Sequence, residues 1–143
     1  MKRKNNIIGI IQARMGSVRL PGKTMKLMMG KPMLQIILEN IEDSKYIDNY
    51  IIATSKRPEN KQIIQLCKKL DVDYYAGSEQ DVLSRFENIS EKYNADYIIR
   101  LTGDNPFVDN TLIDEIIKTF LSEYKDFDYV NNIENSGYPF GLF

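Results

Sequence analysis

The sequence contains no histidine and only one cysteine among its 143 residues. Without histidine, imidazole acid–base chemistry and histidine-ligated metal sites are excluded. The single cysteine, Cys67, cannot form an internal disulfide, which is typical of a protein from a reducing compartment. Its place on the apolar stripe of an expected helix indicates a thiol packed in the core rather than a nucleophile.

A membrane-spanning segment and a general basic surface are also missing. The formal net charge is −1, so no overall field would attract nucleic acid or anionic lipid. No apolar run approaches the roughly 18 residues of a transmembrane helix. The apolar run after residues 2–4 ends at Gln12 and Arg14 without a small-residue cleavage site. We therefore expect a cytoplasmic protein with no nucleic-acid or membrane partner.

Short apolar runs of strand length alternate with segments of helical periodicity along the chain. The expected strands cover 7–11, 49–55, 72–75, 97–101 and 128–131. The expected helices cover 32–41, a segment beginning at Pro58, 82–93, and a segment capped by Asp109 or Asn110. The last helix carries Leu112, Ile113, Ile116, Phe120 and Leu121. This alternation predicts a single α/β domain over 1–143, with a mainly parallel sheet covered on both faces.

The first expected strand runs into a loop that carries Gly16, Ser17 and three cations: Arg14, Arg19 and Lys23. Glycine allows backbone N–H groups to approach phosphate oxygens, and Arg and Lys add charge-assisted hydrogen bonds. This composition favours a phosphate site over a solvent-exposed turn. The P-loop motif does not fit, because one residue too many separates its two glycines, and the dinucleotide motif is absent.

The pattern Gln-Ala-Arg-x-Gly-Ser-x-Arg-x-Pro-x-Lys at 12–23, followed by Gly-Lys-Pro-Met at 30–33, resembles the cytidylyltransferases that activate sugars. These are the acylneuraminate and 3-deoxy-manno-octulosonate cytidylyltransferases, and the match is closest to the branch of spore-coat polysaccharide biosynthesis. The resemblance implies a three-layer α/β/α, Rossmann-like nucleotide-diphospho-sugar transferase (GT-A-like) fold. It also implies transfer of CMP from CTP to a sugar hydroxyl, with release of pyrophosphate, for surface polysaccharide or glycoconjugate biosynthesis.

The same resemblance assigns roles to individual residues. Arg14 and Lys23 would act on the triphosphate as catalytic cations, and Asp104 would hold Mg²⁺. Without the resemblance, the Asp104 loop fits a simple turn equally well. The implied nucleotide-binding residues are Gln12, Ala13, Arg14, Gly16, Ser17, Arg19, Lys23, Gly77, Ser78, Asp81, Thr102 and Gly103. Ser78 and Asp81 could instead cap a helix, and Arg85 could lie on a solvent-exposed helix face.

Related chains continue beyond the position of Phe143 with a segment that binds the sugar and contributes to a homodimer. In the related pattern an acidic second metal ligand follows Gly-Leu, where Phe143 stands here. We expect the apolar residues Tyr138, Phe140, Leu142 and Phe143 to lack their packing partner, and this chain to bind CTP but to transfer CMP very slowly or not at all. The alternative is a nucleotide-binding module that needs a partner or a further segment.

Overall fold

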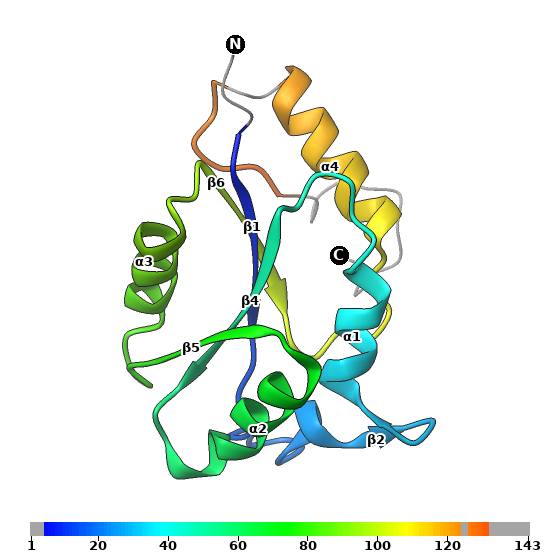
Figure 1. The fold of residues 1–143 in the computed structure, drawn as a ribbon, viewed down its shortest axis with the longest axis vertical. Helices are drawn as coiled ribbons and strands as arrows, with labels where there is room; N and C mark the ends of the chain where they lie inside the picture. Colours follow the sequence, from blue (N-terminus) through cyan, green and yellow to red (C-terminus); the bar gives the residue numbers. More distant parts are fainter. Residues whose placement is uncertain (1–4, 124–125, 132–143) are drawn as a thin grey trace.

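The computed structural model describes residues 5–123 and 126–131 (Figure 1). Four strands form one parallel sheet in the order β5-β4-β1-β6. They are β1 (Ile7–Gln12), β4 (Asn49–Ser55), β5 (Asp73–Gly77) and β6 (Tyr97–Thr102). The Ile-rich sequence of β1 suits its central place, because a strand with parallel neighbours on both sides is buried on both faces.

In the described part of the chain, four α-helices and two single 3₁₀ turns accompany these strands, and α4 follows the last strand. The helices are α1 (Met33–Ile41), α2 (Lys61–Leu70), α3 (Val82–Tyr93) and α4 (Asn110–Glu123). The 3₁₀ turns are η1 (Lys23–Met25) and η2 (Pro58–Asn60). Strands β2 (Leu27–Met28) and β3 (Lys31–Pro32) form a small antiparallel hairpin that the sequence analysis did not predict.

The helices cover both faces of the sheet, which confirms the predicted three layers (Figure 1). Ile8 and Ile10 of β1 pack with Ile89 of α3 on one face. Ile7 and Ile11 point the other way, into the larger core built with α1, α2 and α4. The chain adds β4 and β5 on one side of β1 and then crosses back to add β6 on the other side. Because such crossovers are right-handed, the reversal places α3 on the opposite face from α1 and α2.

Most predicted elements are confirmed, and their differences have local causes. The helix expected from Pro58 begins as η2 and becomes α-helical only at Lys61. Asp109 caps α4, since its carboxylate accepts the N–H groups of Thr111 and Leu112 at 2.8 and 3.3 Å. The buried stripe of α4 includes Ile117, which the predicted set omitted.

The strand predicted over 128–131 is wrong, because residues 126–131 contain no strand. Their side chains Phe127 and Tyr129 are 60% and 73% exposed, so within the described ranges they lack the cover that a buried strand needs. The apolar residues Tyr138, Phe140, Leu142 and Phe143 lie outside the described residues.

Cys67 is fully buried in α2, as predicted, and burial raises the pKa of its thiol to about 11. A thiol with so high a pKa remains protonated at neutral pH and is a poor nucleophile. None of the helices described in the structure is long and apolar enough to cross a bilayer.

Candidate functional site

Three loops leave the sheet at the same edge, because the carboxyl ends of the parallel strands are aligned. Gln12 at the end of β1 pairs with Ala53 of β4 and with Thr102 of β6. The strand order reverses at β1, between β4 on one side and β6 on the other. Ligands of open α/β sheets bind outside the carboxyl ends of strands at such a reversal. The candidate site therefore lies among the loops 13–23, 78–81 and 103–109.

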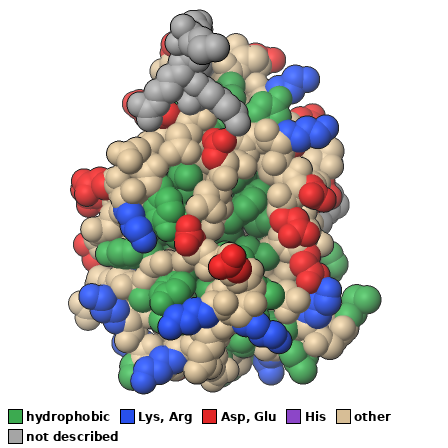
Figure 2. Space-filling model, in the orientation of Figure 1, with side chains coloured by type: hydrophobic (Ala, Val, Ile, Leu, Met, Phe, Trp, Pro, Cys, Tyr) green, Lys and Arg blue, Asp and Glu red, His purple; other side chains and the backbone are tan. Residues whose placement is uncertain are grey.

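The first loop and α2 lie at the lower end of the view in Figure 1. Figure 2 has the same orientation, and Lys and Arg side chains gather at that end of the molecule. Arg14 and Arg19 of the first loop are exposed, and Lys23 is half-buried. The molecule as a whole is close to neutral, so the positive charge here is a local feature. A local cluster of this kind attracts an anionic ligand to one place rather than to the whole surface.

The first loop folds back onto the carbonyl of Met15. That oxygen accepts the N–H groups of both Ser17 and Gly22, each at 2.9 Å. Gly22 has a φ of +68°, a left-handed conformation that glycine adopts without strain. The N–H of Ala13 donates to β4 at 3.0 Å, so Ala13 and Ser17 already have partners for their N–H groups. Within residues 5–123 and 126–131, the N–H of Gly16 has no acceptor.

An ion pair joins the first loop to the loop after β6. The ammonium of Lys23 donates to a carboxylate oxygen of Asp104. This hydrogen bond is the main reason why the pKa of Asp104 is lowered. Partial burial of the carboxylate raises the pKa, and a hydrogen bond from Thr102 lowers it further. Asp104 is therefore ionised at neutral pH. The structure thus brings together Lys23, one of the two predicted catalytic cations, and the predicted metal ligand Asp104, which are 81 positions apart.

Gly103 explains how the two loops approach so closely. Its N–H donates to the carbonyl of Gln12 at 2.8 Å. A Cβ atom at Gly103 would lie 2.8 Å from that same oxygen and 2.9 Å from the Cβ of Ala13. No larger residue fits without moving the backbone of β1 or β6, so glycine here is required by the contact between the strand ends.

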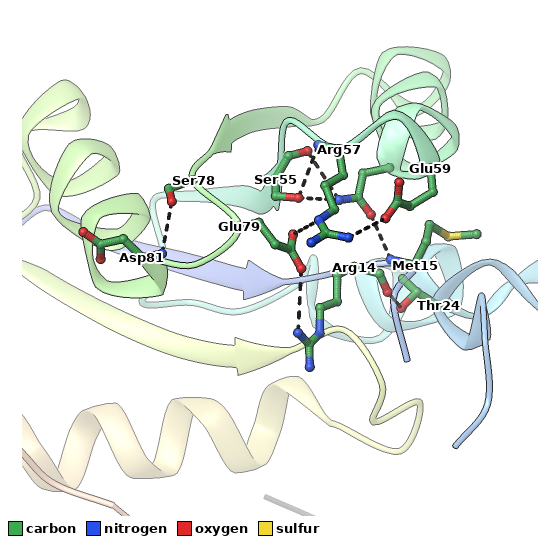
Figure 3. Close-up of polar contacts among 10 residues, drawn as sticks. Arg14, Met15, Thr24, Ser55, Arg57, Glu59, Ser78, Glu79 and Asp81 are labelled. Atoms are coloured by element: carbon green, nitrogen blue, oxygen red, sulfur yellow. Dashed lines mark hydrogen bonds and ion pairs between the residues drawn. The ribbon is translucent and has the colours of Figure 1, made fainter. Parts of the chain in front are cut away.

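A second set of charges joins the first loop to the loop after β5. The carboxylate of Glu79 points between two guanidinium groups, 3.9 Å from Arg14 and 4.0 Å from Arg57 (Figure 3). Arg57 also lies 3.6 Å from Glu59. The sequence analysis assigned no role to Glu79 or Arg57. The available signal was the place of Glu79 directly after Gly77 and Ser78, which the resemblance assigns to the nucleotide, but the partners of Glu79 come from distant parts of the chain.

The two polar residues at the start of α3 act as its cap. The carboxylate of Asp81 accepts the N–H of Ser84 at 2.9 Å, and the hydroxyl of Ser78 accepts the N–H of Asp81 at 3.1 Å (Figure 3). Both contacts match the capping alternative of the sequence analysis. Asp81 and Ser78 remain exposed, so capping leaves other oxygen lone pairs open to a ligand.

The solvent-exposed placement considered for Arg85 is wrong, because its side chain is only 2% exposed. Burial lowers the pKa of the guanidinium, and the nearby charge of Glu79 opposes that shift. Gly77 makes room for this side chain, since a Cβ there would lie 2.8 Å from the Cγ of Arg85. Position 85 lies three residues after Val82 and four before Ile89, so the apolar spacing of α3 was the available signal for its burial, although the residue there is charged.

Oxygen atoms at the end of β6 are the best candidates for metal ligands. Asp104 offers an ionised carboxylate and Thr102 a neighbouring hydroxyl, both hard donors of the kind that Mg²⁺ prefers. Among the described residues, no group of three or more His, Cys, Asp or Glu side chains could hold a metal. The donor set therefore fits a cation that takes its remaining ligands from water and substrate phosphates.

Comparisons with known proteins agree with this architecture. A family model described as cytidylyltransferase matches residues 8–137. The spore coat polysaccharide biosynthesis protein SpsF of Bacillus subtilis is 39% identical over 132 residues, covering 90% of this chain and 55% of that protein. A 3-deoxy-manno-octulosonate cytidylyltransferase of Pelobacter propionicus is 30% identical over 121 residues, covering 82% of this chain and 46% of that protein.

A solved structure of a cytidylyltransferase from Leptospira borgpetersenii superimposes with a TM-score of 0.74 at 32% identity, covering 84% of this chain and 50% of that one. The fold is therefore the Rossmann-like nucleotidyltransferase fold that the sequence resemblance implied. The chain spans about half the length of the curated relatives it matches.

Proposed function

The chain belongs to the cytidylyltransferase family, and from that premise we propose that it transfers CMP from CTP to a sugar hydroxyl, giving a CMP-sugar and pyrophosphate. The observation that most supports this function is the contact between Lys23 and Asp104 at the point where the strand order reverses. It joins a cationic loop and a carboxylate, which are the two kinds of group that a metal-bound triphosphate needs. The similarity to the spore coat polysaccharide biosynthesis protein of Bacillus subtilis supports a role in polysaccharide biosynthesis.

The first loop is proposed to bind the triphosphate. Arg14 and Lys23 each supply a charge-assisted hydrogen bond, worth roughly 1.5–3 kcal/mol, to phosphate oxygens. The N–H of Gly16 lies on an exposed part of the loop and is available to the same oxygens. The remaining proposed nucleotide contacts are Gln12, Ala13, Ser17, Arg19, Gly77, Ser78, Asp81, Thr102 and Gly103.

The chemistry needs no protein nucleophile. The sugar oxygen forms a bond to the α-phosphorus while the bond to the pyrophosphate oxygen breaks, and the hydroxyl proton passes to solvent. Catalysis then consists of holding the reacting groups in line and stabilising the charge on the phosphates with Arg14 and Lys23. Cys67, the only thiol, is buried in α2 and takes no part.

Asp104 is proposed to hold Mg²⁺, with Thr102 beside it. Its carboxylate is ionised at neutral pH, because Lys23 lowers its pKa. When bound there, the cation would supply further neutralisation of the phosphate oxygens. The ammonium of Lys23 then has two possible acceptors, the carboxylate of Asp104 and a phosphate oxygen of the nucleotide. It can move from the carboxylate to the phosphate when the nucleotide binds.

Calorimetry with CTP, UTP, GTP and ATP in the presence of Mg²⁺ tests the nucleotide assignment. We expect CTP to bind more tightly than the other three, and Arg14→Ala to weaken CTP binding by roughly ten- to a hundred-fold. Equal affinities for the four nucleotides would contradict the cytidine assignment while leaving the phosphate site in place. No measurable affinity for any of them would contradict the proposed function itself. Pyrophosphate release with candidate sugars, followed by mass spectrometry of the product, then tests transfer.

A further inference from the structure

A single peptide group in the first loop is held from both sides. The carbonyl of Arg14 accepts the hydroxyl of Thr24 at 3.2 Å, and the N–H of Met15 donates to the side-chain oxygen of Asn60 at 2.9 Å. These two atoms belong to the same peptide bond, the one between Arg14 and Met15. With both of its polar groups bonded, the plane of this peptide is fixed.

The side chain that holds the N–H is itself fixed by the end of β4. The amide nitrogen of Asn60 donates to the hydroxyl of Ser55 at 2.7 Å and to the carbonyl of Ser55 at 3.4 Å. Figure 3 shows Ser55, Met15 and Thr24 gathered around this point. Thr24, Asn60 and Ser55 are 2%, 1% and 0% exposed, so water does not compete for these bonds. We call these three residues the peptide clamp.

The peptide clamp connects the two cations assigned to the triphosphate. Arg14 contributes the carbonyl of the held peptide, so the clamp sets the direction in which its side chain leaves the backbone. Lys23 directly precedes Thr24 in η1, so the same hydroxyl bond fixes the base of the lysine side chain. Met15 also supplies the next carbonyl along the chain, which accepts the N–H of Gly22 and so closes the loop. One buried contact thereby positions both ends of the loop.

We propose that Thr24, Asn60 and Ser55 are positioning residues, which hold Arg14 and Lys23 at the separation that the triphosphate requires. This inference rests on the proposed function, because it assumes that the two cations bind phosphates. None of the three side chains needs to touch the nucleotide. Misplacing a binding group by about 1 Å can cost on the order of a hundred-fold, so loss of the clamp should be measurable although the clamp lies behind the site.

The chain offers a matched pair of substitutions for the test. Thr24→Val removes the hydroxyl that holds the Arg14 carbonyl and keeps the shape of the side chain. Thr54→Val makes the same chemical change at a fully buried threonine of β4 whose hydroxyl has no hydrogen-bond partner among the described residues. Thr24→Ser keeps the hydroxyl, so this variant should bind CTP as the original chain does. Thermal melting of all variants checks that each is folded.

We expect Thr24→Val to weaken binding of CTP with Mg²⁺ by roughly ten- to a hundred-fold, with Thr24→Ser and Thr54→Val close to the original chain. A merely structural role for Thr24 predicts a lower melting temperature with unchanged affinity. Unchanged CTP affinity in Thr24→Val would therefore overturn the positioning role. So would an equal loss of affinity in Thr54→Val.

Amide hydrogen exchange of Met15, followed by NMR without nucleotide, separates this inference from the proposed function. The clamp predicts slow exchange of that amide in the original chain and in Thr54→Val, and faster exchange in Thr24→Val. Rapid exchange in the original chain would overturn the clamp, whatever binds. Slow exchange together with no affinity for any nucleotide would overturn the proposed function, and the positioning role with it, while the clamp itself would stand.

Discussion

Replacing Lys23 with alanine separates its contribution to ligand binding from its contribution to stability. Its ion pair with Asp104 is partly exposed, with 27% and 41% of the two side chains accessible. Exposed pairs of this kind contribute less than about 1 kcal/mol, so the fold should lose little. A charge-assisted contact with phosphate contributes roughly 1.5–3 kcal/mol, so CTP affinity should fall about ten- to a hundred-fold.

Two further consequences make this variant diagnostic. When Mg²⁺ is absent, Asp104 of this variant would face the triphosphate with no cation between them, which adds to the loss of affinity. Its pKa would also return toward the ordinary range, because the hydrogen bond from Lys23 is the main cause of the lowering. A lowered pKa in the folded state adds stability above the unfolded pKa of about 3.9, and that stability is lost as the pH falls through the folded value. Lys23→Ala should therefore weaken the acid dependence of the melting temperature below about pH 4.

Calorimetry at neutral pH and thermal melts over an acid series measure the two effects. Lys26→Ala is the matched control, since it removes an exposed cation three positions away that lies outside the proposed contact. CTP affinity equal in Lys23→Ala and the original chain would refute the reasoning. An equal loss in both alanine variants would show a general charge effect instead of a specific contact.

Four other substitutions give separate checks. Asp104→Asn should abolish the Mg²⁺ dependence of nucleotide binding, measured with a fluorescent CTP analogue; an unchanged Mg²⁺ response would make this residue a turn former only. Gly16→Ala should keep the melting temperature, because no atom lies within 4 Å of the added Cβ, yet weaken CTP binding if phosphate approaches there; calorimetry and melting decide. Gly103→Ala should destabilise the fold by roughly 1–3 kcal/mol in chemical unfolding, because its Cβ would lie 2.8 Å from a carbonyl oxygen; unchanged stability would show that the strand ends can separate. Thr54→Val should raise the free energy of unfolding by about 1 kcal/mol, since its buried hydroxyl has no partner among the described residues, and a lower value would indicate a bound water there.

The sheet could be predicted from the sequence because its central strands are locally unambiguous. The apolar runs at 7–11 and 49–55 are too short for helices and rich in isoleucine, and the structure places β1 and β4 there. The run over 128–131 offers only Tyr129 and Val130 as strand-favouring residues, and strand formation also depends on a neighbour that supplies hydrogen bonds. Sequence pattern does not contain that information, and residues 126–131 form no strand.

The candidate site was predictable only in part for a similar reason. Lys23 and Asp104 could each be placed on a loop, but their contact follows from the strand order, which puts β6 next to β1. Nothing in the sequence indicated that Asn60 is buried, since a polar residue near a helix start is usually a solvent-exposed cap. Its burial against the first loop, and that of Arg85 beneath the loop after β5, arise from tertiary packing.

The central place of β1 has a consequence for how the chain acquires its structure during synthesis. Of the four strands described in this sheet, β1 is made first, yet its second neighbour is complete only at Thr102. Until then the backbone N–H and C=O groups along one of its edges can pair with any other extended chain. Closing a loop of 81 positions between Lys23 and Asp104 is also slow compared with local contacts. The ability to bind a nucleotide should therefore arise late in folding. A molecule that can bind the nucleotide is then one in which β1 already pairs with a neighbouring strand on each side.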